Sequence, residues 1–150
     1  MSTFKSKPVS YYLLLAFLVF QGISGLFGGG ALIWNPTGSA LQMPISLLEG
    51  SLFSDYLIPG IILFTILGIF PLIVCLGLWQ RKLWGWWGAL LVSMALIIWI
   101  GVEIAMVGYH SDPPLQLIYG LLAIGLFIIV QLPAIRFLFE PNFRRDGTPN

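Results

Sequence analysis

Residues 41–60 read LQMPISLLEGSLFSDYLIPG and form the only sizeable segment between long hydrophobic runs that is neither short nor a plain linker. Pro44 suits the first turn of a helix, and Gly50 suits a C-terminal stop. The segment Pro44–Glu49 therefore predicts a short interfacial helix, after which the chain turns back towards the next hydrophobic run. The whole stretch predicts a small structured cap on a helical protein.

Two acidic residues of this cap are candidate site residues. Ser54 or Asp55 can cap the helix that follows, and Pro59 falls in its opening turns, where a missing N–H is least disruptive. The simplest interpretation makes Glu49 a solvated side chain and Asp55 a helix cap. The alternative places both in a cluster that binds a ligand at one membrane surface.

The composition on either side of the cap identifies the solvent. The chain has 150 residues, of which 58% are hydrophobic and 9% charged, and its mean hydropathy is +0.94. These values are typical of a protein that lies mostly in lipid. The net charge of +1 provides no basic field, so nucleic acid is excluded as a partner class.

The scarcity of Cys and His limits the chemistry. The chain has one Cys, Cys75, and one His, His110. A single Cys excludes an internal disulfide and a paired-thiol redox mechanism, and a lone His argues against bis-histidine haem within one protomer. No cofactor is predicted.

Four hydrophobic runs are long enough to cross a membrane, which takes roughly 20 helical residues. We predict one domain over residues 1–150, an all-α membrane protein with an antiparallel bundle of four transmembrane helices and the short interfacial helix between the first and second. Its parts are spans at about 11–34, 56–79, 83–108 and 115–135, an outer cap at 35–55 and a cytoplasmic tail at 136–150.

The positive charges predict the orientation. Four spans place every basic residue on one side, whereas the two opposite loops contain Glu49, Asp55 and Asp112 and no Lys or Arg. By the positive-inside rule both termini are cytoplasmic, in a multi-pass protein of the bacterial cytoplasmic (inner) membrane. The basic residues are Lys5, Lys7, Arg81, Lys82, Arg136, Arg144 and Arg145.

The segment GGGALIWNPTGSALQMPISLLEGSLFSDYLIPG, residues 28–60, resembles a family of small, uncharacterised four-span bacterial membrane proteins. The shared pattern is a glycine-rich first span followed by P-x-G-S, M-P and L-L-E-x-S-x-F-x-D-Y-x-I-P-G. The resemblance implies a topology and no activity. The matching positions are Pro36, Gly38, Ser39, Met43, Pro44, Leu47, Leu48, Glu49, Ser51, Phe53, Asp55, Tyr56, Ile58, Pro59 and Gly60.

Small residues mark two helix faces for close packing. Gly22, Gly25 and Gly29 share one face of the first span, and Gly120 begins a similar patch with Ala123 in the fourth. The first face predicts packing within the chain, a homodimer seam, or a groove for a lipid or a flat ligand.

Three prolines and polar residues modify the later spans. Pro71 removes a backbone hydrogen bond and predicts a kink, with the freed carbonyl met by a neighbouring helix or by a hydroxyl such as that of Thr65. Gln131 and Pro133 lie near the inner end of the fourth span. The tail RFLFEPNFRRDGTPN, residues 136–150, mixes aromatic and basic residues and is expected to lie along the headgroup surface.

Glu103 is the most informative single residue. It lies about one turn inside the outer end of the third span, on one face with Trp99 and Met106. A carboxylate at this depth needs water, a partner or a proton. It is either a proton-coupled or cation-binding site, or a structural residue hydrogen-bonded to the outer loops or to Gln21.

The outer loop YHSDPP, residues 109–114, adds His110 and Asp112 to the acidic groups on this side. Their spacings match no standard ligand pattern, so no metal site is predicted. A cluster that binds an organic cation or a polar headgroup remains an alternative.

Three functions remain open. The favoured one is a non-enzymatic integral membrane protein that acts by binding, as an accessory subunit or scaffold in a membrane complex or with lipid. The alternative is a small oligomeric transporter or ligand-binding bundle that uses Glu103 as a protonatable site, with Gln21 and the outer acidic groups. The second alternative is a membrane enzyme that modifies a lipid or isoprenoid. Expected partners are membrane lipid and either a membrane protein or a second copy of the chain.

Overall fold

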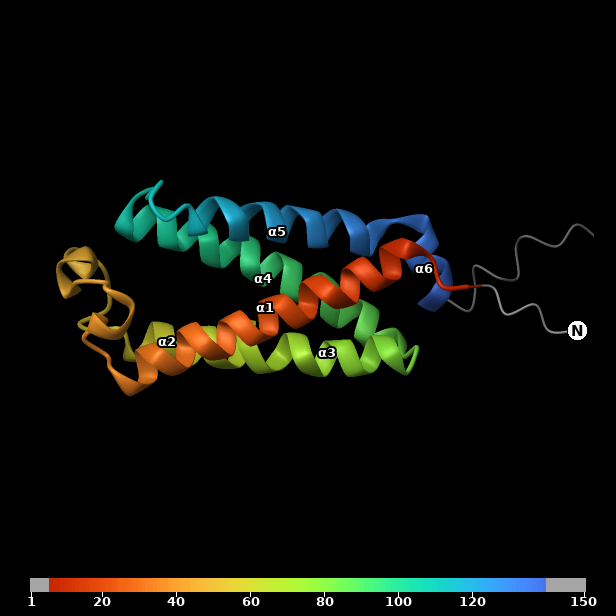
Figure 1. Ribbon diagram of the computed structural model, residues 1–150, viewed down its shortest axis with the longest axis horizontal. Coiled ribbons are helices and arrows are strands. Elements are labelled where there is room, and N and C mark those ends of the chain that lie inside the picture. Colours follow the sequence, from red (N-terminus) through yellow and green to blue (C-terminus); the bar gives the residue numbers. More distant parts are fainter. Residues whose placement is uncertain (1–5, 140–150) are drawn as a thin grey trace, which may run out of the picture.

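The computed structural model describes residues 6–139, and all regular structure in this range is helical, as the sequence predicts (Figure 1). Leu115–Gln131 (α5) and Pro133–Phe139 (α6) together pass the length and hydropathy test for a membrane span, but they are bent by 60°. Three further helices pass it alone: Val9–Trp34 (α1), the run Leu57–Trp79 (α2, η3 and α3) and Leu83–Val107 (α4). The chain thus has the apolar helices of a multi-pass membrane protein.

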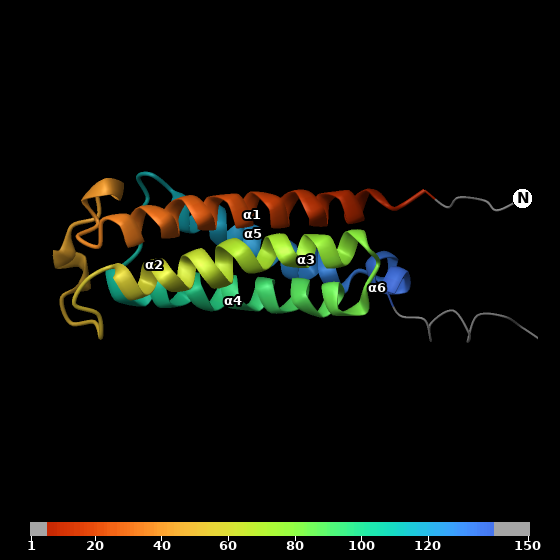
Figure 2. The same cartoon turned by 90° about the horizontal axis from the view of Figure 1, so that it is seen from below.

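The long helices lie side by side along one axis (Figures 1 and 2). α1 packs mainly on α2, η3 and α3, whereas α3 packs on α4 and α4 packs on α5. The cap between α1 and α2 lies at one end together with the α4–α5 loop. The α3–α4 turn and α6 lie at the opposite end.

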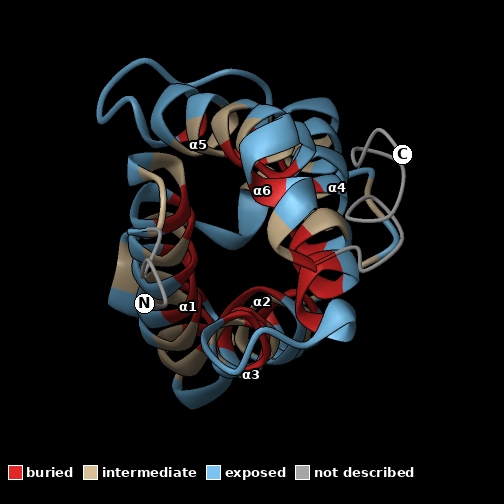
Figure 3. Cartoon of the chain, turned by 90° about the vertical axis from the view of Figure 1, so that its right-hand side faces the viewer, coloured by how far each residue is buried: buried red, intermediate tan, exposed pale blue. Residues whose placement is uncertain are grey.

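Viewed along this axis, the buried residues face the middle and the exposed residues face outward (Figure 3). The outward faces are as apolar as the core, which suits a protein surrounded by lipid tails. Core residues include Tyr11, Leu14, Leu18, Val74, Leu78, Ala89, Val92, Leu96, Leu126 and Val130. Exposed apolar residues include Phe20, Phe27, Ile73, Leu91, Ile98, Leu121 and Ile128.

The glycine face of α1 packs against the backbone of the α2–α3 run. A Cβ added to Gly25 would lie 2.5 Å from the carbonyl carbon of Leu67, and one added to Gly29 would overlap the backbone of Phe64. Such contacts leave no room for any side chain larger than hydrogen. Of the predicted uses of this face, packing within the chain is the one that the structure contains.

The other two glycines of interest differ from each other. A Cβ on Gly22 would lie 2.6 Å from the side chain of Leu72, so this position is also closely packed. A Cβ on Gly120 would meet only Ile100, at 3.9 Å, which is an ordinary contact. The close approach expected at Gly120 is absent because the Ile100 side chain occupies the space between α4 and α5.

The disturbance caused by Pro71 lies in the turn before it. Residues Thr65–Ile69 form a π-helix (η3), and Pro71 is the second residue of α3. In a regular helix Pro71 would leave the Leu67 carbonyl without its donor. Gln21 Nε2 on α1 donates to that carbonyl at 3.2 Å. The neighbouring helix therefore meets the freed carbonyl, whereas the Thr65 hydroxyl donates within its own helix.

The fourth apolar run is broken, so the prediction of one span at 115–135 is wrong in its inner turn. α5 ends at Gln131, and Leu132 is extended, with φ −57° and ψ 135°. The residue before a proline avoids the α conformation, and Pro133 can only begin a new helix. α6 turns across the end of the bundle and buries Ile135 in the core. The rest of the predicted tail lies outside the described residues.

The cap is built from tight turns. Ser39–Leu41 (η1) and Ile45–Leu48 (η2) are 3₁₀ helices, so the helix predicted over Pro44–Glu49 is one short 3₁₀ turn. Gly38 has a positive φ of 77° and its carbonyl accepts hydrogen bonds from two later backbone N–H groups. These bonds close the chain into compact turns before a regular helix can start.

Tyr56 fastens the cap to the bundle. Its hydroxyl donates to the Pro44 carbonyl at 3.0 Å, and its backbone N–H donates to the Pro36 carbonyl at 2.9 Å. The ring is buried with Leu32 and Leu48. Tyr56 precedes the span that begins at Leu57, and burial raises the pKa of its phenol.

Candidate functional site

Glu103 lies on the last turns of α4 and is half-buried. Gln116 Nε2 on α5 donates to Glu103 Oε1 at 3.3 Å. The indole of Trp99, one turn earlier on the same helix face, is a second hydrogen-bonding partner. The carboxylate is therefore held by neutral donors from two helices rather than by a cation.

Gln116 is the centre of this network and is 5% exposed. Its Nε2 also donates to the Gly108 carbonyl at 3.0 Å, and its Oε1 accepts the backbone N–H of His110 at 2.8 Å. One side chain thus pairs both backbone groups that the end of α4 leaves unsatisfied. The amide ties the α4–α5 loop to both helices and fixes the position of Glu103.

His110 is the only cation-forming side chain near this network among the described residues. Its ring lies at the exposed end of the loop, where Nδ1 is 3.3 Å from the Gly108 carbonyl. The ring also exerts a direct electrostatic effect on the Glu103 carboxylate. The structure therefore brings together three predicted site residues, Glu103, Trp99 and His110, and adds Gln116 to them.

Gln21 does not belong to this site. Its amide faces Leu67 in the middle of the bundle, and the side chain is 2% exposed. Within the described chain its Oε1 has no hydrogen-bond partner. The predicted pairing of Gln21 with Glu103 is wrong, because the carbonyl freed by Pro71 takes the amide instead.

The two acidic residues of the cap also stand apart. Asp55 Oδ1 accepts the backbone N–H of Leu57 at 2.9 Å, which caps the start of α2. Glu49 is exposed after the η2 turn. Across residues 6–139, no three His, Cys, Asp or Glu side chains lie close enough together to hold a metal ion.

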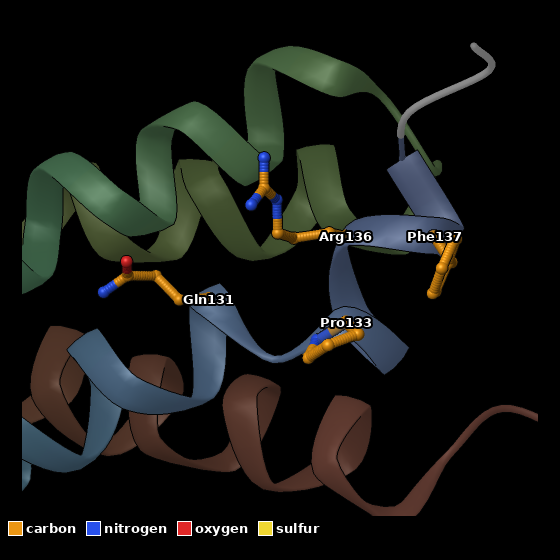
Figure 4. A pocket seen from close by; sticks show the side chains of 4 residues that line it. All are labelled: Gln131, Pro133, Arg136 and Phe137. Atoms are coloured by element: carbon orange, nitrogen blue, oxygen red, sulfur yellow. The ribbon is translucent and has the colours of Figure 1, made fainter. Parts of the chain in front are cut away.

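A pocket of about 230 Å³ lies at the other end of the molecule, at the bend between α5 and α6 (Figure 4). Gln131, Pro133, Arg136 and Phe137 line it. Sequence reasoning singled out Gln131 and Pro133 only as inner-end residues of the fourth span. The pocket was missed because it arises from the break at Leu132.

Cations and aromatic rings are paired at this end. Lys7 Nζ lies 4.4 Å from the ring centre of Tyr11 and 5.3 Å from that of Trp79. Arg136 Cζ lies 5.8 Å from the ring centre of Trp86. Such pairs suit the boundary between lipid tails and headgroups, where an aromatic ring meets both apolar and charged groups.

No family model, curated protein or solved structure matches this sequence. The family resemblance of residues 28–60 therefore stays a prediction. The molecule offers two polar features for a functional role, the Gln116 network at the cap end and the pocket at the α5–α6 bend.

Proposed function

We propose that this chain is an antiparallel four-span protein of a bacterial cytoplasmic membrane, with both termini in the cytoplasm. We further propose that it acts by binding, without catalysis, as an accessory subunit or scaffold of a membrane complex. The charges support the orientation by the positive-inside rule. The described basic residues gather at the α6 end, namely Lys7, Arg81, Lys82 and Arg136, and the described carboxylates at the cap end, namely Glu49, Asp55, Glu103 and Asp112.

The outer cap carries the proposal of binding. Its backbone is fastened by Tyr56, and the Ser51 hydroxyl accepts the backbone N–H of Phe53 at 3.1 Å, which fixes the intervening turn. Leu52 in this turn is 100% exposed. Burying a leucine side chain is worth about 1.5–3 kcal/mol. A membrane-protein partner with an apolar pocket at the outer surface would bury Leu52 on a backbone that is already ordered.

Native mass spectrometry of the protein, extracted gently from its own membrane, tests this function. We expect a constant protein partner at fixed stoichiometry, and we expect Leu52→Asp to release it. Ser46→Asp is the matched control, because Ser46 is another exposed cap residue. A partner that stays bound to the Leu52→Asp variant, or a chain that is always alone, would refute the proposal. A complex made only of copies of this chain would replace the accessory role by self-assembly.

A ligand or proton site at Glu103 is the second candidate function. The observation that favours it is a half-buried carboxylate with an indole and an amide as its partners. Proton flux into proteoliposomes that contain a pH-sensitive dye separates the two functions. Loss of flux in Glu103→Gln, with flux retained in the exposed-residue control Glu49→Gln, would support transport. Equal and negligible flux in all three proteins would reject it.

A further inference from the structure

The pocket at the α5–α6 bend combines one cation with apolar walls. Arg136 contributes a guanidinium group and Gln131 an amide, whereas Pro133 and Phe137 contribute apolar surface. All four side chains surround the bend, and Arg136 extends towards α4 (Figure 4). Its volume of about 230 Å³ is large enough for a phosphate group and the atoms next to it. A ligand that fills it must have an anionic part and an apolar part.

The cation of the pocket is held in place from α4. Trp86 is 5% exposed, and its Nε1 donates to the Val130 carbonyl at 2.9 Å. This bond fixes the indole between α4 and α5. The Arg136 guanidinium lies 5.8 Å from the centre of that ring. A planar guanidinium that rests near a fixed indole keeps its outer N–H donors directed away from the ring, where they suit a phosphate oxygen pair.

The surroundings favour an anionic lipid over a zwitterionic one. Lys7, Arg81 and Lys82 lie at the same end of the molecule as Arg136. The four carboxylates within residues 6–139 all lie at the cap end. A zwitterionic headgroup would bring its own cation into this positive region, whereas an anionic headgroup would not.

We propose that this pocket binds the phosphate-bearing headgroup of an anionic phospholipid in the inner leaflet. Arg136 contacts the phosphate, Gln131 contacts the polar headgroup, and Pro133 and Phe137 pack against the start of the acyl chains. The phosphate chemistry is shared with free phosphate, but the apolar walls select the lipid. The inference depends on the proposed membrane placement and does not depend on a protein partner.

Native mass spectrometry of the full chain in detergent, with added dioleoyl-phosphatidylglycerol or dioleoyl-phosphatidylcholine, measures the preference. We expect one phosphatidylglycerol to stay bound in preference to phosphatidylcholine. Arg136→Gln should reduce that preference by about fivefold, the effect of one cation near an anionic lipid surface. Lys82→Gln is the control, because it removes an exposed cation at the same end but outside the pocket.

A second pair of variants tests the pocket without touching Arg136. Gln131→Glu places a carboxylate in the pocket and should also abolish the preference, whereas Gln80→Glu adds the same charge at an exposed position outside it. Equal effects of pocket and control variants, or no preference in the wild-type chain, would overturn the proposal. Displacement of the lipid by inorganic phosphate, but not by acetate at equal ionic strength, would assign the site to free phosphate and overturn the lipid assignment. Lost lipid preference with a protein partner retained overturns this inference and leaves the accessory function intact.

Discussion

Replacement of Gly25 by alanine tests how closely α1 packs on the α2–α3 run. The added Cβ would lie 2.5 Å from the Leu67 carbonyl carbon and 2.8 Å from the Gly68 nitrogen. Both are backbone atoms, so no side chain can rotate away to make room. The two helices must separate locally.

The size of the effect follows from these distances. Ordinary contacts begin at 3.4 Å, so the backbones must move apart by about 0.9 Å, an overpacking that destabilises by about 1–3 kcal/mol. The same movement weakens the 3.2 Å hydrogen bond from Gln21 to Leu67, which is worth about 0.6 kcal/mol in a membrane protein. A Cβ on Gly101 meets nothing within 4 Å. Because Gly101→Ala shares the helix-propensity gain, Gly25→Ala should be about 2–3 kcal/mol less stable than this control.

Reversible unfolding in mixed detergent and SDS micelles, followed by circular dichroism, measures both variants. We expect a lower free energy of unfolding for Gly25→Ala and an unchanged or higher one for Gly101→Ala. If the two variants are equally stable, α1 does not pack at this distance and the glycine face is not an internal seam.

The polar contacts at the two ends of the bundle give three further predictions for the same unfolding assay. Tyr56→Phe removes one hydrogen bond and should destabilise the protein by about 1 kcal/mol. Because burial raises the pKa of the Tyr56 phenol above its usual value of 10.0, the wild-type chain should lose this stability as the pH rises above about 10, and Tyr56→Phe should lose less; equal alkaline losses would contradict the assignment. Gln116→Leu leaves three groups without their partner and should destabilise by about 2–3 kcal/mol, whereas Glu103→Gln, which removes a charge and keeps an acceptor, should change stability by less than about 1 kcal/mol; the reverse order would refute the central role of Gln116. Trp86→Phe keeps an aromatic ring but loses the N–H donor, and should destabilise by about 1 kcal/mol and weaken lipid preference; an unchanged lipid preference would show that the indole does not position the pocket cation.

The long helices could be predicted because hydropathy alone determines which segments enter lipid. Hydropathy does not determine how two such helices are rotated against each other. The sequence contained both partners of the Gln21–Leu67 hydrogen bond, a buried amide and a carbonyl freed by Pro71. The pairing could not be chosen, because Glu103 offered Gln21 an equally plausible partner until the depth of each helix was known.

Gln116 was missed although the sequence held a signal for it. It lies in the first turn of the helix after the YHSDPP loop, and Glu103 lies in the last turns of the helix before that loop. Residues at these positions face each other when two helices form a tight hairpin. The prediction also required the rotation of both helices, which uniformly apolar faces do not reveal.

The break in the fourth apolar run was predictable from backbone chemistry but hidden by hydropathy. Leu132 precedes Pro133 and therefore avoids the α conformation, yet the residues on both sides remain apolar enough to suggest one continuous span. The pocket at this bend depends on the break and could not be predicted without it.

The most direct test of the central claim is the labelling of single cysteines in intact bacterial cells with a membrane-impermeant maleimide. Cys75 is replaced by alanine to remove the native thiol, and one cysteine is introduced at either Leu52 or Lys82, both exposed at opposite ends of the molecule. The account predicts that the Leu52→Cys variant is labelled in intact cells and that the Lys82→Cys variant is labelled only after permeabilisation. Labelling of Lys82→Cys in intact cells, or protection of Leu52→Cys until permeabilisation, would contradict a four-span protein with an outward-facing cap.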